Sequence, residues 1–233
     1  MKKILMIIMI LVLLVGCNTS KKEMTDAMRF KEEYENLNGE KTSYDDSYYR
    51  TIDIAEDNPI IYKDASDIVK MIDNKDTFVV YFGFSSCPWC RSVVPNLISV
   101  ANVLGIDTIY YVDVKDIRDT MELDSDGNII TSKEGIDSYY ELLNRLDSVL
   151  DDYTLTDKDG NVVDTNEKRI YAPNIVAVVD GVATKMTTGI SDLQENAYDD
   201  LTDEINNESY DKIKCTIECI KEEKKICSID KKC

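Results

Sequence analysis

The chain has 233 residues, of which 43% are hydrophobic and 31% are charged, which is enough to bury one globular core and carry additional segments. Its formal net charge of −18 argues against nucleic acid and anionic lipid head groups as partners, because both repel an acidic surface. The absence of histidine excludes chemistry that needs an imidazole.

Residues 1–17 have the pattern of a secretory leader. Two lysines precede an apolar run over 4–15 that is too short to span a bilayer comfortably. The run ends at Gly16-Cys17, which resembles the bacterial lipobox and implies cleavage before Cys17 and lipid attachment to its thiol. An ordinary secretory signal, with Cys17 incidental, is the alternative. We therefore expect a lipoprotein anchored through Cys17 to the extracytoplasmic face of the membrane of a Gram-positive-type bacterium.

Residues 18–47 are predicted to link this anchor to the folded part. Residues 21–36 are polar with thinly spaced apolar positions, which predicts a solvated helix ending near Asn38-Gly39. This segment is either a stalk that lifts the domain off the membrane or a disordered linker. In residues 48–54, β-forming side chains alternate with polar ones, and this pattern predicts an edge strand.

The next segments predict the core. Residues 60–62 read as a first strand, and apolar residues over 65–72 recur at helical spacing. An apolar, β-branched and aromatic run over 78–84 predicts a buried strand, an amphipathic helix covers 93–103, and a further parallel strand covers 108–114. This β-α-β-α-β order predicts a right-handed, parallel start to a sheet.

The tetrapeptide Cys87-Pro88-Trp89-Cys90 lies between the buried strand and the helix. A cysteine at the helix N-cap has its sulfur against unsatisfied N–H groups and the positive end of the helix dipole, and both favour the nucleophilic thiolate. Pro88 suits the first helical position. Cys90 lies one turn on, where it can attack a mixed disulfide on Cys87. We predict that Cys87 is the nucleophile and Cys90 the resolving thiol.

Two simpler interpretations of this cysteine pair exist. It could be half of a zinc site, but the nearest other cysteines are Cys17 and Cys215 and the chain has no histidine. It could be a structural disulfide, but a bridge within one helical turn cross-links almost nothing. The redox interpretation is therefore favoured, and no metal is expected.

Residues 60–206 resemble the thioredoxin family, and 81–91 are similar to the thioredoxin-like bacteriocin-transport accessory proteins of Gram-positive bacteria. The resemblance implies an α/β fold with a mixed central sheet flanked by helices. It also implies a cis-proline beside the cysteines, which Ala172-Pro173 matches, followed by a strand over 175–179. In this family the segment presents a backbone edge to a substrate peptide.

The resemblance therefore places Ala172 and Pro173, together with Pro88 and Trp89, at the substrate. Two departures matter. Thioredoxins carry a buried carboxylate six positions before the first cysteine, where this chain has Tyr81, and their intervening dipeptide is usually Gly-Pro. The direction of electron flow, reduction or oxidation, is therefore open at this point.

The segment 115–169 is longer than the helix that a thioredoxin has before its cis-proline, which predicts an insertion. A helix is expected over 134–150 and a hairpin over 153–163. The insertion either lies over one side of the active-site face or is a peripheral addition. The Asp-x-Asp-Gly-Asn stretches at 124–128 and 157–161 predict turns rather than calcium loops, because each lacks a bidentate glutamate at the required spacing.

The chain closes with a predicted antiparallel hairpin over 175–187. Residues 191–194 have capping-box form and predict a last core helix. Its expected buried stripe is Leu193, Ala197, Leu201 and Ile205. The thioredoxin-like domain is thus predicted over 48–208.

Residues 209–233 are predicted to form a separate tail with four cysteines, namely Cys215, Cys219, Cys227 and Cys233. An even number in an oxidising compartment favours two structural disulfides, and a Cys219–Cys227, Cys215–Cys233 pairing within a helical hairpin is one of three possible connectivities. A four-thiolate zinc site and disulfide exchange with the active pair are the alternatives.

Together these features predict a membrane-tethered thiol–disulfide oxidoreductase that acts on cysteines of exported proteins, with an unidentified redox partner and no cofactor. A dedicated accessory protein for the maturation or export of one disulfide-containing secreted peptide is a narrower alternative. A redox-inactive binding lipoprotein on the same scaffold is a third.

Overall fold

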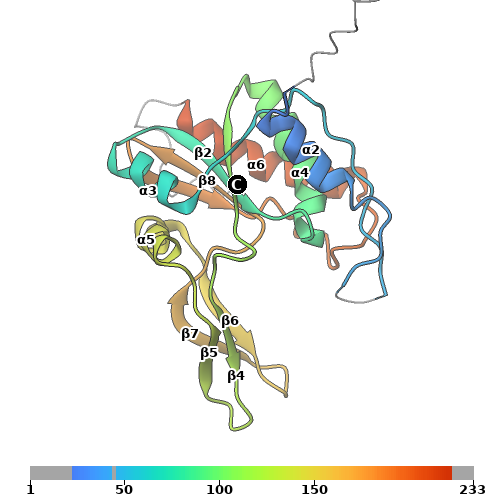
Figure 1. The fold of residues 1–233 in the computed structure, drawn as a ribbon. Coiled ribbons are helices and arrows are strands. Elements are labelled where there is room, and N and C mark those ends of the chain that lie inside the picture. The colour runs from blue at the N-terminus through green and yellow to red at the C-terminus, as the bar shows by residue number, and fades with distance from the viewer. Residues whose placement is uncertain (1–22, 44–45, 222–233) are drawn as a thin grey trace, which may run out of the picture.

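The computed structural model describes residues 23–43 and 46–221, which form a mixed α/β fold around a five-stranded sheet (Figure 1). This confirms the predicted α/β class and the mixed central sheet. The strand order is β1-β3-β2-β8-β9. The strands are β1 (Ile60–Tyr62), β2 (Phe78–Gly83), β3 (Ile109–Asp113), β8 (Asn174–Val179) and β9 (Val182–Thr187).

The direction of the strands changes at the middle of the sheet. β1, β3 and β2 are parallel, whereas β8 runs antiparallel to β2 and pairs with β9 in a hairpin. Every residue of the central strand β2 is buried, since this strand has neighbours on both edges and helices on both faces. Its apolar sequence lacks the alternation of a half-exposed strand for the same reason.

Two pairs of helices cover the sheet. α3 packs against α5 on one side, and α4 packs against α6 on the other (Figure 1). Their bounds are α3 (Ala65–Asp73), α4 (Pro88–Leu104), α5 (Asp137–Leu146) and α6 (Asp203–Ile217), and short 3₁₀ turns follow α5 at Asp147–Val149 and α6 at Glu218–Ile220.

The N-terminal helix α2 (Asp26–Glu35) belongs to the core, so the expectation of a solvated helix in this segment is wrong. Phe30 and Tyr34 are both 0% exposed and lie one turn apart on the face that meets the sheet. These two aromatic side chains form the apolar contact of an otherwise polar helix, and polar contacts such as that of Asp26 with the Tyr62 N–H add to it. The signal in the sequence is weak because only these two large residues define the buried face.

The edge strand predicted over 48–54 is absent from the described residues, where only an isolated bridge joins Lys41 and Tyr48. The backbone of this segment forms hydrogen bonds with side chains instead of with a neighbouring strand. Asn38 exchanges hydrogen bonds with the N–H and carbonyl of Ile52, and Glu35 accepts from the N–H of Ile54. Side-chain amide and carboxylate groups therefore replace a strand partner, and Ile52 and Ile54 point into the core.

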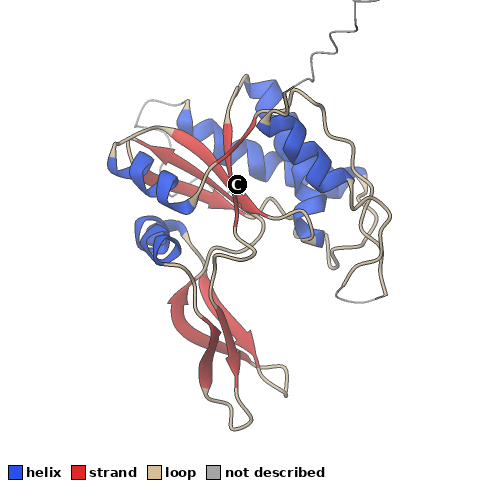
Figure 2. Cartoon of the chain, viewed as in Figure 1, coloured by secondary structure: helices blue, strands red, loops and turns tan. Residues whose placement is uncertain are grey.

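Two β-hairpins project together from the sheet and form what we call the arm, residues 119–133 and 152–169 (Figure 2). They are β4 (Thr120–Leu123) with β5 (Ile129–Lys133), and β6 (Asp152–Thr156) with β7 (Val162–Lys168). The predicted hairpin and helix of this region are confirmed, and both Asp-x-Asp-Gly-Asn stretches are turns. Asp124 and Asp157 each accept two downstream backbone N–H groups with one carboxylate oxygen.

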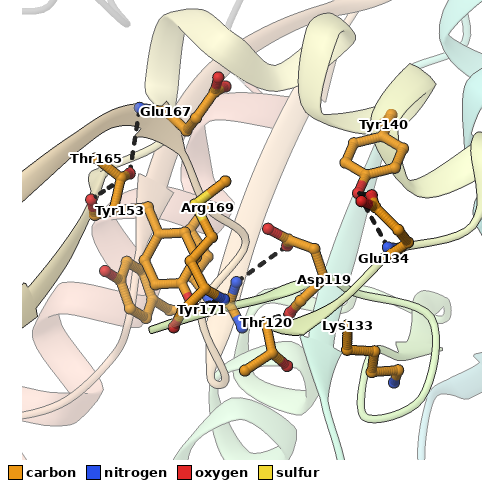
Figure 3. A network of polar contacts seen from close by, with 12 residues as sticks. Asp119, Thr120, Lys133, Glu134, Tyr140, Tyr153, Thr165, Glu167, Arg169 and Tyr171 are labelled. Carbon is orange, nitrogen blue, oxygen red and sulfur yellow. Dashed lines mark hydrogen bonds and ion pairs between the residues drawn. The ribbon is translucent and has the colours of Figure 1, made fainter. Parts of the chain in front are cut away.

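The base of the arm is a compact polar network (Figure 3). Arg169 donates to the carboxylate and to the carbonyl oxygen of Asp119, and its guanidinium lies 4.0 Å from the centroid of the Tyr153 ring. The Tyr153 hydroxyl in turn bonds the backbone of Met121 in the other hairpin. The two hairpins are thereby joined to each other where they leave the body.

The last helix begins later than predicted. Residues 191–201 form turns, Leu193 is 59% exposed, and α6 starts only after the N-cap Thr202. The Ser191 hydroxyl accepts the Leu193 N–H in a local turn and donates to the Glu208 carboxylate of α6, and no helix follows it directly. The boundary expected at residue 209 falls inside α6, whose Ile213 and Ile217 are fully buried in the core.

Candidate active site

The two cysteines of Cys87-Pro88-Trp89-Cys90 lie where the central strand passes into α4. After β2 ends, the N–H of Cys87 bonds the carbonyl oxygen of Phe84 in a tight turn. Cys87 has extended backbone dihedrals and is the N-cap of α4, and Pro88 is the first helical residue. Proline suits that position because its missing N–H would have no partner there.

The Cys87 sulfur has two short contacts. It accepts a hydrogen bond from the Cys90 N–H at 3.2 Å, and its thiol donates to the carbonyl oxygen of Ala172, also at 3.2 Å. The Ala172–Pro173 peptide bond is cis. Residues 85 positions apart in the chain are thus brought together, and the backbone that precedes β8 borders the sulfur directly.

Cys90 is 0% exposed and Cys87 is 4% exposed, and both are free thiols. One turn of helix separates them, so Cys90 lies behind Cys87 on the side of the sheet. In such a pair only the outer sulfur can meet a large substrate first. The inner one is placed to attack a sulfur already bonded to the outer one.

The electrostatic environment separates the two thiols. Hydrogen bonding from the Cys90 side chain and N–H, together with the charge of Arg118, lowers the pKa of Cys87 against the opposing effect of burial. For Cys90, burial and the neighbouring Cys87 sulfur raise the pKa well above that of an ordinary thiol. The outer sulfur is therefore the one that ionises first, as a nucleophile must.

Arg118 is a residue that the sequence did not single out. It lies in the loop between β3 and the arm, and its guanidinium is 5.4 Å from the centroid of the Phe84 ring, three residues before Cys87. Neighbouring Asp119 is engaged by Arg169. Among the described residues Arg118 has no carboxylate partner within ion-pair distance, so its charge remains available to the cysteines. No sequence pattern connects residue 118 with residue 87.

Arg91 directly follows Cys90 and is the next residue of α4. It is 0% exposed and donates to the carbonyl oxygens of Tyr34, Arg50 and Ser85 and to the side chain of Asn38. Its charge is thus solvated by peptide dipoles instead of by an acid. Arg91 fastens α2 and the segment after it to the first turn of α4.

The residues predicted to contact the substrate differ in their burial. Pro88, Trp89 and Ala172 are partly exposed, and Pro173 is buried. Trp89 also packs against the hydrophobic core. Cys17, Cys227 and Cys233 lie outside the described residues.

Cys215 lies in α6 and Cys219 in the turn that follows, and both are disulfide-bonded. The Lys185 ammonium lies 3.1 Å from the Cys215 sulfur. Helix α6 packs on the sheet through Ile213 and Ile217, so Cys215 and Cys219 lie beside the core and not on an isolated tail.

Within residues 23–43 and 46–221, no cluster of three or more acidic, cysteine or histidine side chains has the geometry to hold a metal ion. In the same part of the chain, no helix combines the length and the hydropathy that a membrane crossing requires.

Comparison with protein-family models and with curated proteins found no match to this chain. The site must therefore be interpreted from its own geometry.

Proposed function

We propose that this chain is a thiol–disulfide oxidoreductase with a thioredoxin-like fold, tethered outside the cell membrane, which acts on cysteines of exported proteins. The observation that carries the proposal is the position of Cys87. Its sulfur caps the start of α4, accepts the Cys90 N–H at 3.2 Å and has a lowered pKa, while a second free thiol lies one turn behind it.

The arrangement of the chain supports the same proposal. The cis-proline beside the cysteines, the strand that follows it and the mixed central sheet are what the resemblance to thioredoxins implies, and a parallel β-α-β-α-β start and a closing antiparallel hairpin suit the same fold. The contact between the Cys87 sulfur and the Ala172 carbonyl adds that the backbone before β8 borders the reacting atom. A substrate strand that lies along this backbone would bring its own cysteine to Cys87.

In the proposed reaction the Cys87 thiolate attacks a substrate disulfide and forms a mixed disulfide, and one substrate sulfur leaves as a thiolate. Cys90 then attacks the Cys87 sulfur and releases the second substrate sulfur. Pro88, Trp89, Ala172 and Pro173 form the surface around the bond that is exchanged. The electron pair resides on the two cysteines, so the step itself requires no cofactor. The reverse sequence oxidises a substrate dithiol.

The decisive experiment measures disulfide exchange by the purified protein in both directions, on an oxidised and on a reduced model substrate. Exchange that is abolished by Cys87→Ser and reduced by Cys90→Ser supports the proposal. A wild-type protein without exchange in either direction overturns it and leaves a binding lipoprotein. The reduction potential then assigns the direction, because about −270 mV is typical of thioredoxin and about −120 mV of a dedicated oxidase.

The membrane tether rests on the sequence around Cys17, which lies outside the described residues. Growth with a radiolabelled fatty acid tests it directly. We expect label on the wild-type protein and none on Cys17→Ser, with the variant released from the membrane fraction. Label that persists in the variant would contradict lipid attachment at this cysteine.

The arm favours the narrower form of the proposal, a protein dedicated to one client. Both ends of the arm lie close to the site along the chain. Before the arm begins, the Lys115 ammonium donates to the Ser86 hydroxyl at 3.0 Å, and after it ends at Arg169, Ala172 follows three residues later. Ile129, Ile130 and Val162 on the arm are 39%, 41% and 71% exposed, which offers apolar contacts to a bound protein. Cys90→Ser traps clients as mixed disulfides on Cys87. One dominant adduct supports a dedicated protein, whereas many adducts support a general one.

A further inference from the structure

Two positively charged side chains lie beside the turn that leads into Cys87. Both come from the loop that joins β3 to the arm. The Lys115 ammonium donates to the Ser86 hydroxyl at 3.0 Å and lies 6.0 Å from the centroid of the Phe84 ring. The Arg118 guanidinium lies 5.4 Å from the same ring centroid. Two cations thus border one aromatic ring, three residues before the reacting sulfur, and we call this pair of side chains the cationic rim.

Neither cation of the rim is neutralised within the described chain. Over residues 23–43 and 46–221 no carboxylate lies within ion-pair distance of Lys115 or Arg118. The acidic residues of the same loop have other positions: Asp113 accepts the backbone N–H of Lys115, Asp116 is exposed, and Asp119 is paired at the base of the arm. The two positive charges are therefore open to a group that approaches the site.

The two cations differ in how far they are removed from water. Lys115 is exposed, whereas Arg118 is half-buried. A half-buried guanidinium attracts an anion more strongly than a fully solvated ammonium does, because less water screens its charge. The Arg118 charge also lowers the pKa of the Cys87 thiol, so its field extends to the reacting sulfur. Arg118 is consequently the stronger of the two rim charges.

Disulfide exchange brings the neighbours of a client cysteine to this rim. When a client sulfur bonds Cys87, the residues on either side of the client cysteine lie only about 3.8 Å along the chain from it, Cα to Cα. Their side chains then meet the groups that border Phe84 and Ser86. Lysine and arginine bind carboxylates through charge-assisted hydrogen bonds, and they repel other cations.

We propose that Lys115 and Arg118 select clients in which an acidic residue stands next to the reacting cysteine. This inference rests on the proposed function and names its substrate class. Both are specificity-determining residues and take no part in the exchange itself. In that step the Cys87 thiolate attacks the client sulfur, the new disulfide forms, and the departing sulfur leaves with the electron pair. A basic residue next to the client cysteine would face two like charges, so the rim discriminates by repulsion as well as by attraction.

The test uses three peptides of one sequence, in which both neighbours of a single cysteine are glutamate, glutamine or lysine. Each cysteine carries a thiopyridyl group as a mixed disulfide. The protein is the full chain with Cys90→Ser, so the reaction ends when Cys87 bonds the peptide sulfur and releases coloured thiopyridone, which stopped-flow absorbance follows. A chain with Cys87→Ser and Cys90→Ser measures release by any other thiol, and this background is subtracted.

The quantity compared is the rate constant for the glutamate peptide divided by that for the glutamine peptide. Each rate constant is first divided by that of the same peptide with dithiothreitol, which removes differences in the peptides themselves. A variant that only changes the acidity of Cys87 leaves this ratio unchanged, because the same thiolate attacks both peptides. The ratio therefore reports recognition of the client's charge separately from the reactivity of the thiol.

At low salt we expect a ratio of about fivefold, as for a partly screened charge pair, falling toward equality in about 1 M salt. Arg118→Gln should remove most of the preference, and Lys115→Gln a smaller part of it. Arg118→Glu should reverse the order, so that the lysine peptide reacts faster than the glutamate peptide. Lys70→Gln removes a charge from an exposed position on α3 and should leave the ratio unchanged.

The outcomes also distinguish this inference from the proposed function. A chain that releases no thiopyridone from any of the three peptides overturns the oxidoreductase itself. Equal rates for the glutamate and glutamine peptides, or a ratio that is the same after Arg118→Gln and Lys115→Gln are combined, overturn only the role of the rim. If Arg118→Gln does not fold, Lys115→Gln and the salt series decide, and a ratio that neither changes overturns the proposal.

Discussion

The Arg169 guanidinium and the Asp119 carboxylate lie 3.0 Å apart, from Nη1 to Oδ1, and their side chains are only 8% and 6% exposed. Asp119 is where the chain enters the arm, and Arg169 is where the chain leaves it (Figure 3). One buried ion pair thus closes the base of the arm beside the candidate site.

Breaking this pair on one side should be costly. In Arg169→Met the Asp119 carboxylate stays buried without its partner, and we expect a loss of about 3–5 kcal/mol in the free energy of unfolding. Urea denaturation measures it. Lys168→Met is the control, since its ion pair with Asp152 is largely exposed and should contribute no more than about 1 kcal/mol. The double variant Asp119→Leu with Arg169→Met should recover most of the loss, and equal losses in the single and double variants would refute the explanation.

Arg118 should control the reactivity of the outer thiol. Its positive charge favours the Cys87 thiolate, so Arg118→Gln should raise the pKa of Cys87 and slow its alkylation by iodoacetamide near neutral pH by about fivefold, on the order of 1 kcal/mol for a partly buried charge. Thiolate absorbance against pH reports the titration. Lys70→Gln removes the same charge from an exposed site on α3 and is the control. Identical titration curves in the two variants would exclude a specific role for Arg118.

Arg91 should be required for the docking of α2. Lysine cannot reach the several acceptors that the buried guanidinium bonds, so Arg91→Lys should lower the free energy of unfolding by about 3 kcal/mol. Hydrogen exchange should rise across residues 26–54 more than in β2. Arg29→Lys, at a side chain that is 54% exposed, should change little. If hydrogen exchange rises equally across the whole Arg91 variant, Arg91 does not act specifically on α2 and the segment after it.

Glu208 should make stability depend on pH. Hydrogen bonds from Ser191, from Lys212 and from the Asp192 N–H lower its pKa to about 2. A lowered carboxyl pKa means that the stabilisation is complete above the ordinary value of about 4.3 and is lost as the pH falls toward 2. The difference in unfolding free energy between wild type and Glu208→Gln should therefore be largest near pH 7 and shrink below pH 4. The exposed Glu195→Gln should show no such trend, and a pH-independent difference for Glu208 would contradict the assignment.

Much of the core was predictable because its signals are local. The apolar run of β2, the helical spacing over 65–72 and the Asp180-Gly181 turn each depend on neighbours within one or two turns of chain. The arm hairpin over 152–168 was predictable from its Asp-Gly turn for the same reason.

The errors lie where side chains satisfy distant groups. Ser191 has the form of a helix cap, yet it donates to Glu208, and the N-cap of α6 is Thr202, eleven residues later. Segment 48–54 alternates as a strand does, yet its backbone bonds Glu35 and Asn38. A local sequence pattern predicts the conformation that a segment favours, but it does not predict which distant group its side chains and backbone bond.

The sequence by itself determined the spacing of Cys87 and Cys90, their place between a buried strand and a helix, and the acidic, histidine-free composition around them. Only the tertiary structure decided which groups surround the two sulfurs. The Ala172 carbonyl oxygen reaches the Cys87 sulfur from 85 positions away, and the positive charge of Arg118 lowers the pKa of Cys87, because packing selects neighbours by shape and burial, and no order along the chain encodes that selection.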